Sequence, residues 1–431
     1  MPRSRMFWAV SLGHMTNDLF MSMGPVVLAF LSVTILPMSN TQIGLTVSAT
    51  QMMGAISQPG FGLMADRNGG RWLGAGGVVW TAGFFMLALV MSQTGYFWLM
   101  FVPFVLMALG SGAFHPAGAM HAANSERGQE ATSLSYFFLM GQFGLALGPV
   151  VAGLLLDAAN PASDGVFAMP FNGVVNTFIF SGHVASIYLV GVLVIPVVWW
   201  MFSVLPVSSL YREVLANSPR RAPLKLSALP WGAFSVLGAM VALRSLAQPG
   251  SVTFIPVLFQ QKGWTPSEYG VITSLFWVGS GIAGIVFGNL ADHFDRRRVV
   301  AITLMLAAPT FFLLPVFDGA TALLLAVAAG ALSGGSHSII VVLAQELIPA
   351  AKGFASGAIL GFIFGMGALG SVLIGSLSDS IGLGTTFQLV AVAIVIAGVL
   401  ALLLPARRAP TALDTTGPAL DSETVVNASA R

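Results

Sequence analysis

The feature that most restricts the fold is the length of the stretches without charge. Residues 19–65 contain no charged side chain, and similar stretches recur, so that only 8% of the 431 residues are charged. A soluble domain carries about 25% charged residues, which it needs to cover its surface. A chain of this size with so few charges cannot be a soluble globular protein, and we expect lipid to surround it.

The charges divide the sequence into segments that suit membrane-spanning helices, which need about 20 apolar residues each. Residues 19–65 are long enough for two spans with a turn at 37–40, and residues 72–125 hold two more, separated near 92–95. Further spans are expected at about 131–156, 181–206, 230–260, 266–291, 299–316, 320–347, 353–377 and 383–405. The sequence therefore predicts twelve spans in an all-α integral membrane protein.

The basic residues predict how these spans are oriented, because cytoplasmic loops collect Lys and Arg. If the N-terminus is cytoplasmic and twelve spans alternate, all of the 18 basic residues except Arg244 and Lys262 lie on the cytoplasmic side. A wrong number of spans would scatter them. We expect both termini in the cytoplasm, a multi-pass location in the cell inner (plasma) membrane, and a disordered polar tail at 406–431.

The two halves of the sequence resemble each other. The peptide GLMADR at 62–67 ends the second predicted span, and GNLADH at 288–293 ends the eighth, an offset of 226 residues. GAFH at 112–115 and GGSH at 334–337 are offset by 222 residues. Such a repeat is typical of transporters in which one half rocks against the other. It predicts six-helix bundles at 1–206 and 230–405, joined by a cytoplasmic linker at 207–229.

These motifs resemble those of a known family. The peptide GLMADRNGGR at 62–71 is similar to a cytoplasmic loop motif of the major facilitator superfamily, and GLALGP at 144–149 is similar to the span-5 motif of its exporters. Three peptides resemble the fosmidomycin-resistance-type exporters: GHMTND at 13–18, AFHP at 113–116 and FASG at 354–357. Those exporters often have an acidic residue after the His-Pro pair, where this chain has Ala117. The resemblance implies two pseudo-symmetric six-helix bundles, the major facilitator fold.

Ionisable side chains inside a membrane are costly and often mark a transport pathway. Away from the span ends, such groups occur in four spans, about 15–20 Å from the cytoplasmic helix ends at 1.5 Å per residue. The candidate pathway residues are His14, Asn17 and Asp18 in span 1, His115 in span 4, Arg244 and Gln248 in span 7, and His337 in span 10. Spans 1, 4, 7 and 10 line the central cavity in the superfamily that the chain resembles.

These residue types suggest how transport would work. Arg244 would hold a carboxylate or phosphonate with two parallel hydrogen bonds, and the histidines, which titrate near neutral pH, would carry a proton. Asp18 would neutralise Arg244 in the empty site. Packing roles remain open: His115 could satisfy a carbonyl freed by Pro116, His14 and His337 could bond neighbouring helices, and a purely structural Arg244–Asp18 pair is an alternative.

Other residues suggest gating and helix packing. A carboxylate at the end of span 2 would lie near the start of span 11, where the helix N-terminus is partly positive. The predicted gating residues are Gly62, Asp66, Arg67 and Arg71 in the first half, and Asp292 and Arg296 in the second. Glu346 is expected to pair with loop arginines. Small residues spaced by four allow helices to approach, and the predicted packing residues are Gly144, Gly148, Pro149, Gly357 and Gly361.

The sequence favours a secondary active transporter. It contains no catalytic constellation, no nucleotide-binding loop, no metal motif and no cysteine, so we expect no enzyme and no cofactor, with the proton gradient as energy source. The predicted function is proton-coupled efflux of a small anionic or amphiphilic compound, with an importer of a carboxylate or sugar as the alternative and a membrane-embedded enzyme disfavoured. The expected partners are the small-molecule substrate, protons and the lipid bilayer. A net charge of +2 does not indicate nucleic acid, and the chain is expected to be a monomer.

Overall fold

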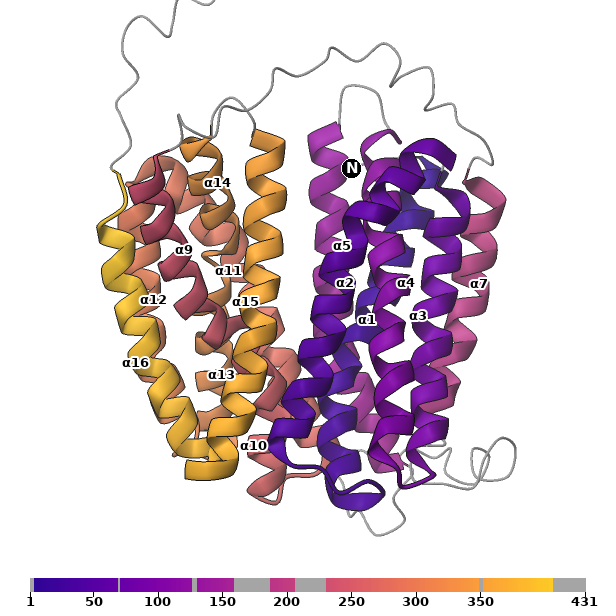
Figure 1. Ribbon diagram of the computed structural model, residues 1–431, viewed down its shortest axis with the longest axis horizontal. Coiled ribbons are helices and arrows are strands. Elements are labelled where there is room, and N and C mark those ends of the chain that lie inside the picture. Colours follow the sequence, from indigo (N-terminus) through magenta and orange to yellow (C-terminus); the bar gives the residue numbers. More distant parts are fainter. Residues whose placement is uncertain are drawn as a thin grey trace, which may run out of the picture.

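The computed structural model describes residues 4–68, 70–125, 130–158, 187–205, 230–348 and 352–405. The predicted linker (207–229) and the predicted tail (406–431) lie outside the described residues. All regular structure in the described part is helical. The helices stand side by side along one common direction (Figure 1). Helical spans are expected in lipid, because the backbone must satisfy its hydrogen bonds within the segment.

The first half of the chain forms six long helices. They are α1 (Arg5–Thr34), α2 (Asn40–Asn68), α3 (Arg71–Ser92), α4 (Phe97–Ala123), α5 (Glu130–Ala158) and α7 (Tyr188–Val204). Their bounds follow the predicted spans closely, because the turns fall where the sequence loses its apolar run. At the turn between α3 and α4, Gly95 has φ +73°, which a residue without a side chain adopts readily.

The second half forms six helical rods, two of which are broken. The first rod consists of α9 (Trp231–Ser245), the π-helical turn η3 (Leu246–Gly250), the 3₁₀ turn η4 (Ser251–Phe254) and α10 (Ile255–Gln261). The fourth consists of α13 (Gly319–Gly334) and α14 (His337–Leu347). The unbroken rods are α11 (Pro266–His293), α12 (Arg296–Leu313), α15 (Lys352–Ile381) and α16 (Leu383–Leu402). The predicted spans 230–260 and 320–347 are therefore each interrupted, at Pro249 and after Gly334, since proline and glycine weaken a helix interior.

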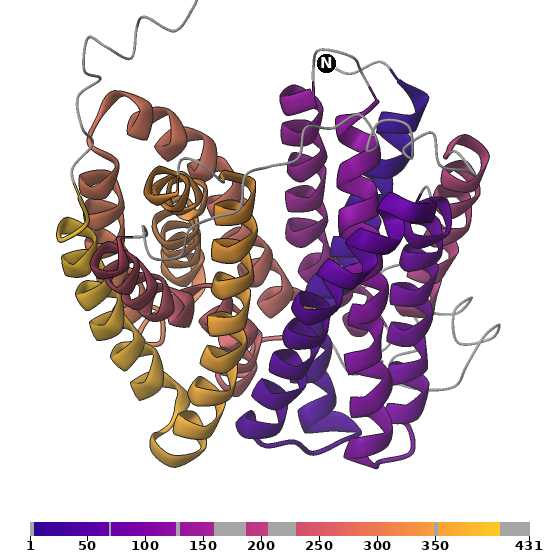
Figure 2. The same ribbon diagram turned by 45° about the horizontal axis from the view of Figure 1, so that its top comes forward.

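The twelve rods form two bundles, which Figures 1 and 2 show side by side. Eight helices of the described part are long and apolar enough to cross a membrane. The other rods are shorter, broken or more polar, but they lie parallel to these eight. The predicted all-α fold with twelve helices is thus confirmed in the described part of the chain.

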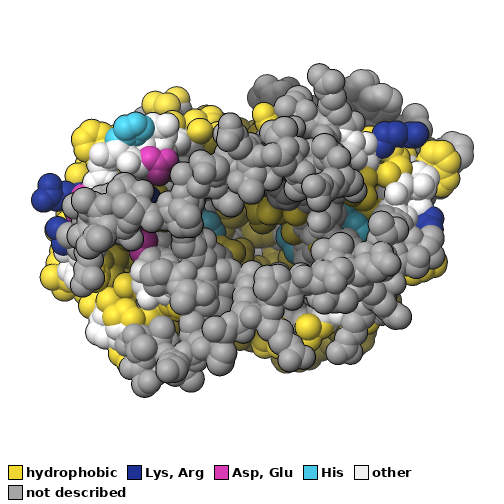
Figure 3. All heavy atoms as spheres, turned by 90° about the horizontal axis from the view of Figure 1, so that it is seen from above, with side chains coloured by type: hydrophobic (Ala, Val, Ile, Leu, Met, Phe, Trp, Pro, Cys, Tyr) yellow, Lys and Arg dark blue, Asp and Glu magenta, His cyan; other side chains and the backbone are white. Residues whose placement is uncertain are grey.

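The bundles meet at one end and separate at the other. Helix α2 packs on α15, and α5 packs on α11, near the end where α1 and α15 finish (Figure 1). Viewed from the opposite end, which carries Arg71 and Arg296, the molecule has a central hollow between the bundles (Figure 3). Histidine side chains lie in the walls of this hollow. We call these the closed end and the basic end of the molecule.

Candidate functional site

Three of the predicted pathway residues form one cluster in the first bundle. Helix α1 carries His14 and Asp18 one turn apart, and α4 brings His115 against them. Asp18 lies between the two rings: its Oδ2 is 3.3 Å from His14 Nε2, and its Oδ1 is 3.4 Å from His115 Nε2. The side chain of His14 is 3% exposed and that of Asp18 11%, whereas that of His115 is 28% exposed. The cluster is thus buried, with His115 as its accessible member.

The surroundings of the Nδ1 atoms of His14 and His115 indicate where the hydrogens of both rings lie. His14 Nδ1 lies 2.8 Å from the Phe137 carbonyl, and His115 Nδ1 lies 2.8 Å from the Ser111 carbonyl. A carbonyl only accepts hydrogen bonds, so each Nδ1 carries a hydrogen, and a neutral ring would then turn the lone pair of Nε2 towards the Asp18 carboxylate. Two acceptors do not face each other without a hydrogen between them. The cluster is therefore built to hold at least one proton on Nε2 or on Asp18.

Asn17 connects this cluster to Ser111 of α4 and to one more helix, α3. Its Nδ2 donates to Asp18 Oδ1 at 3.0 Å and to Ser111 Oγ at 3.0 Å. Its Oδ1 accepts a hydrogen bond from Thr81 Oγ1 in α3 at 3.0 Å. Asn17 and Thr81 are fully buried, so these bonds fix the orientation of the amide and, through it, of the carboxylate.

Sequence reasoning missed several members of this environment. Ser111 had a usable signal, since it lies four positions before His115 on the same helix face. Thr81 had none, and the Phe137 carbonyl is backbone and leaves no trace in the sequence. Gly141 of α5 is also part of the site: a Cβ there would lie 2.6 Å from His14 Nε2 and 2.9 Å from Asp18 Oδ2. Any side chain at this position would displace the cluster.

The second bundle holds a different cluster around Arg244, whose side chain is fully buried. Arg244 Nη2 donates to Gln248 Oε1 at 2.9 Å and to the Ser333 carbonyl at 2.8 Å. Its Nε donates to the same carbonyl at 3.2 Å, and Gln248 Nε2 donates to Ser280 Oγ at 3.1 Å. Gln248 lies in the break of the first rod and Ser333 precedes the break of the fourth, so Arg244 cross-links the two broken helices.

The predicted neutralisation of Arg244 by Asp18 is wrong in this conformation. The ion-pair partners of Asp18 among the described residues are the two histidines, and every hydrogen-bond partner of Arg244 in the described part is neutral. The reason is that Asp18 and Arg244 each have their partners within their own bundle. His337, the remaining predicted residue, begins α14 beside the break of the fourth rod and is half-buried; it is not part of the Asp18 cluster.

The predicted gating residues are only partly described. The side chains of Asp66 and Arg67 lie outside the described residues, although their backbone belongs to α2. A Cβ at Gly62 would make ordinary contact with Pro116, 3.6 Å away. Arg71 donates to the carbonyl of Phe202 and lies 5.6 Å from the centre of its ring. These contacts join α3 to α7 within the first bundle.

In the second bundle, the predicted gating residues pair with each other. Arg296 forms ion pairs with Asp292 at 3.7 Å and with Glu346, which agrees with the expectation that Glu346 contacts loop arginines. All three residues lie in the second bundle, on α11, α12 and α14. A latch between the bundles at the basic end therefore stays a prediction.

The packing glycines give a divided result. A Cβ at Gly144 would collide with the Met15 carbonyl, and one at Gly148 would collide with Ser22 and the Leu19 carbonyl, so α5 needs both glycines to pack on α1. The carbonyl of Pro149 lies against Gly270 of α11. Gly361 has nothing within 4 Å of its Cβ position, and the packing prediction for it is wrong in this conformation, because α15 meets α2 only near the closed end. Gly357 lies outside the residues whose surroundings are described.

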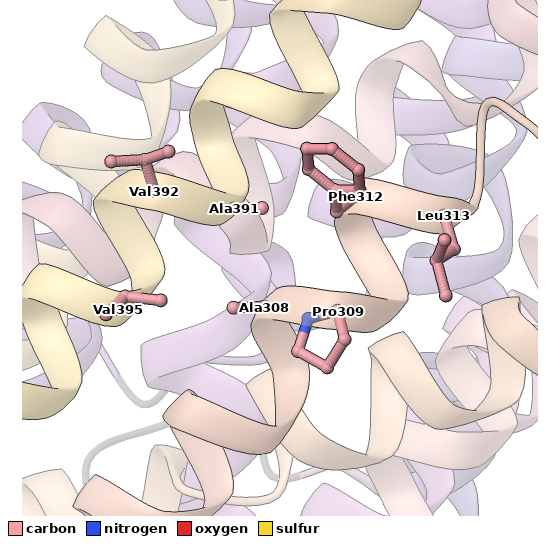
Figure 4. Close-up of a pocket in the computed structure, with 7 residues that line it drawn as sticks. All are labelled: Ala308, Pro309, Phe312, Leu313, Ala391, Val392 and Val395. Carbon is pink, nitrogen blue, oxygen red and sulfur yellow. The ribbon is translucent and has the colours of Figure 1, made fainter.

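A groove elsewhere on the surface is not a second candidate for the site. It lies between α12 and α16 (Figure 4), and its lining is apolar: Ala308, Pro309, Phe312, Leu313, Ala391, Val392 and Val395. No ionisable or hydrogen-bonding side chain faces it, so it suits contact with lipid chains and not chemistry.

Comparison with known proteins gives consistent results. The family model described as Major Facilitator Superfamily matches residues 7–242 and 237–422. The "Fosmidomycin resistance protein" of Escherichia coli (strain K12) is 26% identical over 417 residues, which cover 93% of this chain and 92% of that protein. The "Uncharacterized MFS-type transporter YfnC" of Bacillus subtilis (strain 168) is 26% identical over 416 residues, with 92% and 91% covered.

Solved structures share the fold. A D-xylose–proton symporter superposes with a TM-score of 0.70 at 14% identity, covering 93% of this chain and 97% of that one. A bacterial homolog of the human lysosomal transporter Spinster, in an inward-facing and unoccupied conformation, gives a TM-score of 0.70 at 15% identity, covering 93% and 96%. At these identities the likeness concerns the fold alone.

Proposed function

Because the chain belongs to the Major Facilitator Superfamily, a family of multi-pass membrane transporters, we propose that it exports a small anionic or amphiphilic compound in exchange for protons. One half would rock against the other around a central site, which is the usual cycle of such folds. The energy source would be the proton gradient, with no bound cofactor. The proposed working unit is a monomer.

The observation that carries this proposal is the position of Asp18 between His14 and His115. Histidine is the side chain that ordinarily changes charge between about pH 5 and 8. Titratable groups inside a membrane bundle mark proton relays. The arrangement requires a proton, and His115, with its side chain 28% exposed, is open enough to exchange it with water. Donor types and spacing of this kind also suit a metal ion, since the three ligand atoms lie within 4.8 Å of one another.

The presence of Arg244 supports the proposal that the substrate carries an acidic group. A guanidinium binds a carboxylate or phosphonate with two parallel hydrogen bonds, and the described partners of Arg244 are all neutral. The Oε1 atom of Gln248 takes one position that a substrate oxygen would need. We therefore expect substrate binding to displace the Gln248 carboxamide from Arg244.

The open end of the molecule is compatible with the proposed direction of transport. The hollow opens at the basic end (Figure 3), and by the positive-inside rule this end would face the cytoplasm, with both termini. An exporter in the plasma membrane would load its substrate in this state. The name of the Escherichia coli relative also favours export of a drug. An importer of a carboxylate or sugar with the same fold is the alternative.

Transport in proteoliposomes tests the proposal. The purified protein would be reconstituted, a pH gradient imposed in either direction, and uptake measured for fosmidomycin, other phosphonates and hydrophobic drugs. We expect one class of compound to move against the proton flow, with an Asp18→Asn variant inactive. Movement of compound and protons in the same direction would establish the importer instead. A chelator added to a parallel sample separates the metal from the proton: loss of activity there would overturn proton coupling through this cluster.

A further inference from the structure

At the closed end, two carboxylates reach across from one bundle to the other. Asp379, near the end of α15, accepts hydrogen bonds from the backbone N–H groups of Asn40 and Thr41, each at 2.9 Å, and from Thr41 Oγ1 at 2.5 Å. Asp157, near the end of α5, accepts a hydrogen bond from the backbone N–H of Ser267 at 2.9 Å. Each carboxylate therefore binds the N-terminus of a helix of the opposite bundle, α2 or α11, where unpaired N–H groups and the helix dipole favour a negative charge.

Four glycines bring the same helices into backbone contact. A Cβ at Gly44 of α2 would collide with the Ser371 carbonyl of α15, and one at Gly375 of α15 would collide with the Asn40 carbonyl of α2. In the other pair, a Cβ at Gly270 of α11 would lie 2.5 Å from the Pro149 carbonyl of α5, and one at Gly153 of α5 would collide with the Pro266 carbonyl of α11. The closed end depends on the absence of side chains at all four positions.

The two sets of contacts are copies of one another. On the receiving helices α2 and α11, Asn40 corresponds to Pro266, Thr41 to Ser267, and Gly44 to Gly270, each with an offset of 226 residues. On the donating helices α5 and α15, Pro149 corresponds to Ser371, Gly153 to Gly375, and Asp157 to Asp379, each with an offset of 222 residues. These are the two offsets of the internal sequence repeat. The glycine contacts recur in both copies, and so does the bond from the Thr41 or Ser267 N–H to a carboxylate. The bond from the Asn40 N–H has no counterpart, because Pro266 has no N–H.

We propose that these duplicated contacts are the gate of the closed end, and that both carboxylates leave their helix N-termini when the carrier opens there. The contacts suit a reversible gate. A carboxylate on backbone N–H groups forms charge-assisted bonds in the closed state, and water can satisfy both partners once the end opens. No long side chain has to be ordered, because the glycines let the backbones meet directly. This inference concerns the cycle of the protein and is independent of the identity of the substrate.

The two copies differ in exposure and in the number of their hydrogen bonds. Asp157 is 2% exposed, whereas Asp379 is exposed, and water screens an exposed charge more than a buried one. Burial favours the contact of Asp157, whereas the number of hydrogen bonds favours Asp379, which accepts three against the one that Asp157 accepts from Ser267. Removal of either charge is therefore expected to shift the population towards the state open at this end by a similar amount, about three- to tenfold.

Distance measurements between spin labels test the gate. The sequence has no cysteine, so Thr94→Cys and Thr385→Cys supply a labelling pair, one in each bundle at the closed end, without a background to remove. Asp157→Asn, Asp379→Asn and the double variant would be compared in lipid nanodiscs. Asp318→Asn is the matched control, because Asp318 is a carboxylate at the same end that pairs with Lys262 of its own bundle at 3.1 Å.

We expect longer distances in both single variants, a larger shift in the double variant, and none in the control. Gly44→Ala and Gly270→Ala give a second route, since an added Cβ should open the same end without touching a charge. Unfolded protein would be recognised by its lost elution peak and excluded. Unchanged distances in the double variant, or the same shift in the Asp318 control, would overturn the gate.

Discussion

The polar clusters of the two bundles are opposites in charge and in access. In the first bundle, the Asp18 carboxylate lies between two histidines, and one of these is 28% exposed. In the second, Arg244 is fully buried and its described partners are neutral oxygens. The first cluster can change its charge by taking or losing a proton, whereas an arginine stays charged in proteins. Under the proposed function, the two halves, although built on one repeat, would carry different tasks: one would handle an exchangeable proton and the other would supply a fixed positive charge.

If the protein works as proposed, this difference would explain why the bundles move. A buried charge without a counter-charge is costly, and Arg244 lowers that cost with carbonyls at two helix breaks. An anion that enters the hollow would supply the missing counter-charge and would then lie between Arg244 and the titratable cluster. Substrate and proton would compete through their charges even if they never occupied the same atoms. The following predictions test this division of tasks.

The largest effect is expected from Asp18→Asn. The amide has nearly the same shape but can neither hold a proton between the histidines nor balance their charge. Breaking a buried ion pair costs about 3–5 kcal/mol, and we expect proton-driven transport to fall by at least 100-fold while substrate still binds. Transport and equilibrium binding would be measured on the same reconstituted sample. Retained proton-driven transport would show that the two clusters do not divide the tasks as described.

Gln248→Glu tests the second cluster by giving Arg244 a permanent counter-charge. The new carboxylate would replace the Oε1 contact of 2.9 Å with an ion pair of about the same geometry. An acidic substrate would have to displace it, so we expect the apparent affinity for anionic compounds to fall by about tenfold or more. The maximal rate at saturating substrate should change less.

Ser280→Ala is the matched control for this variant. It removes the hydroxyl that accepts a hydrogen bond from Gln248 Nε2 without adding charge near Arg244. We expect it to weaken anion binding by less than about threefold. An equal loss in both variants would mean that the geometry around Gln248 matters and the charge does not, and Arg244 would then be only a link between two broken helices.

The sequence predicted most of the fold because the fold depends on signals that are local. Charge-free runs of the right length gave the spans, and the repeat gave two bundles. The breaks at Pro249 and after Gly334 were also readable, since proline and paired glycines weaken a helix wherever they occur. The depth of Asp18, His115, Arg244 and His337 was predicted by counting residues along four helices.

The pairing of these residues could not be predicted in the same way. Which partner Asp18 has depends on the distance between the bundles, and the sequence has no local signal for that distance. Backbone carbonyls at Phe137 and Ser333 complete both clusters and leave no mark on the side-chain pattern. The closed-end contacts do have a signal in the sequence. Asp157 and Asp379, like Gly153 and Gly375, are separated by the offset of the repeat, and their recurrence at span ends indicates a shared role.

Substitution of His14 or His115 is expected to have a smaller effect, and a different one for each histidine. An Asn side chain at either position can still donate a hydrogen bond to the Phe137 or Ser111 carbonyl, as Nδ1 of the histidine does. It has no group in the place of Nε2. His14 is stacked on Phe137 with ring centres 4.1 Å apart, so His14→Asn should lower thermal stability. His115→Asn should instead flatten the dependence of transport on pH between about 5 and 8, since His115 is the accessible titrating group. Melting curves and pH profiles of both variants would check this, and the reverse assignment would contradict it.

The smallest effect should come from Thr81→Val, which replaces a hydroxyl by a methyl group of similar size. Thr81 contacts no charged atom of the cluster; it donates to Asn17 Oδ1, and Asn17 donates to Asp18. Loss of one neutral hydrogen bond is worth about 1 kcal/mol, or about fivefold at most. We expect a two- to fivefold slower transport with an unchanged pH profile, because the orientation of the carboxylate loosens while its titration partners stay. A loss as large as that of Asp18→Asn would place Thr81 in the proton pathway itself, and the first cluster would then extend across three helices.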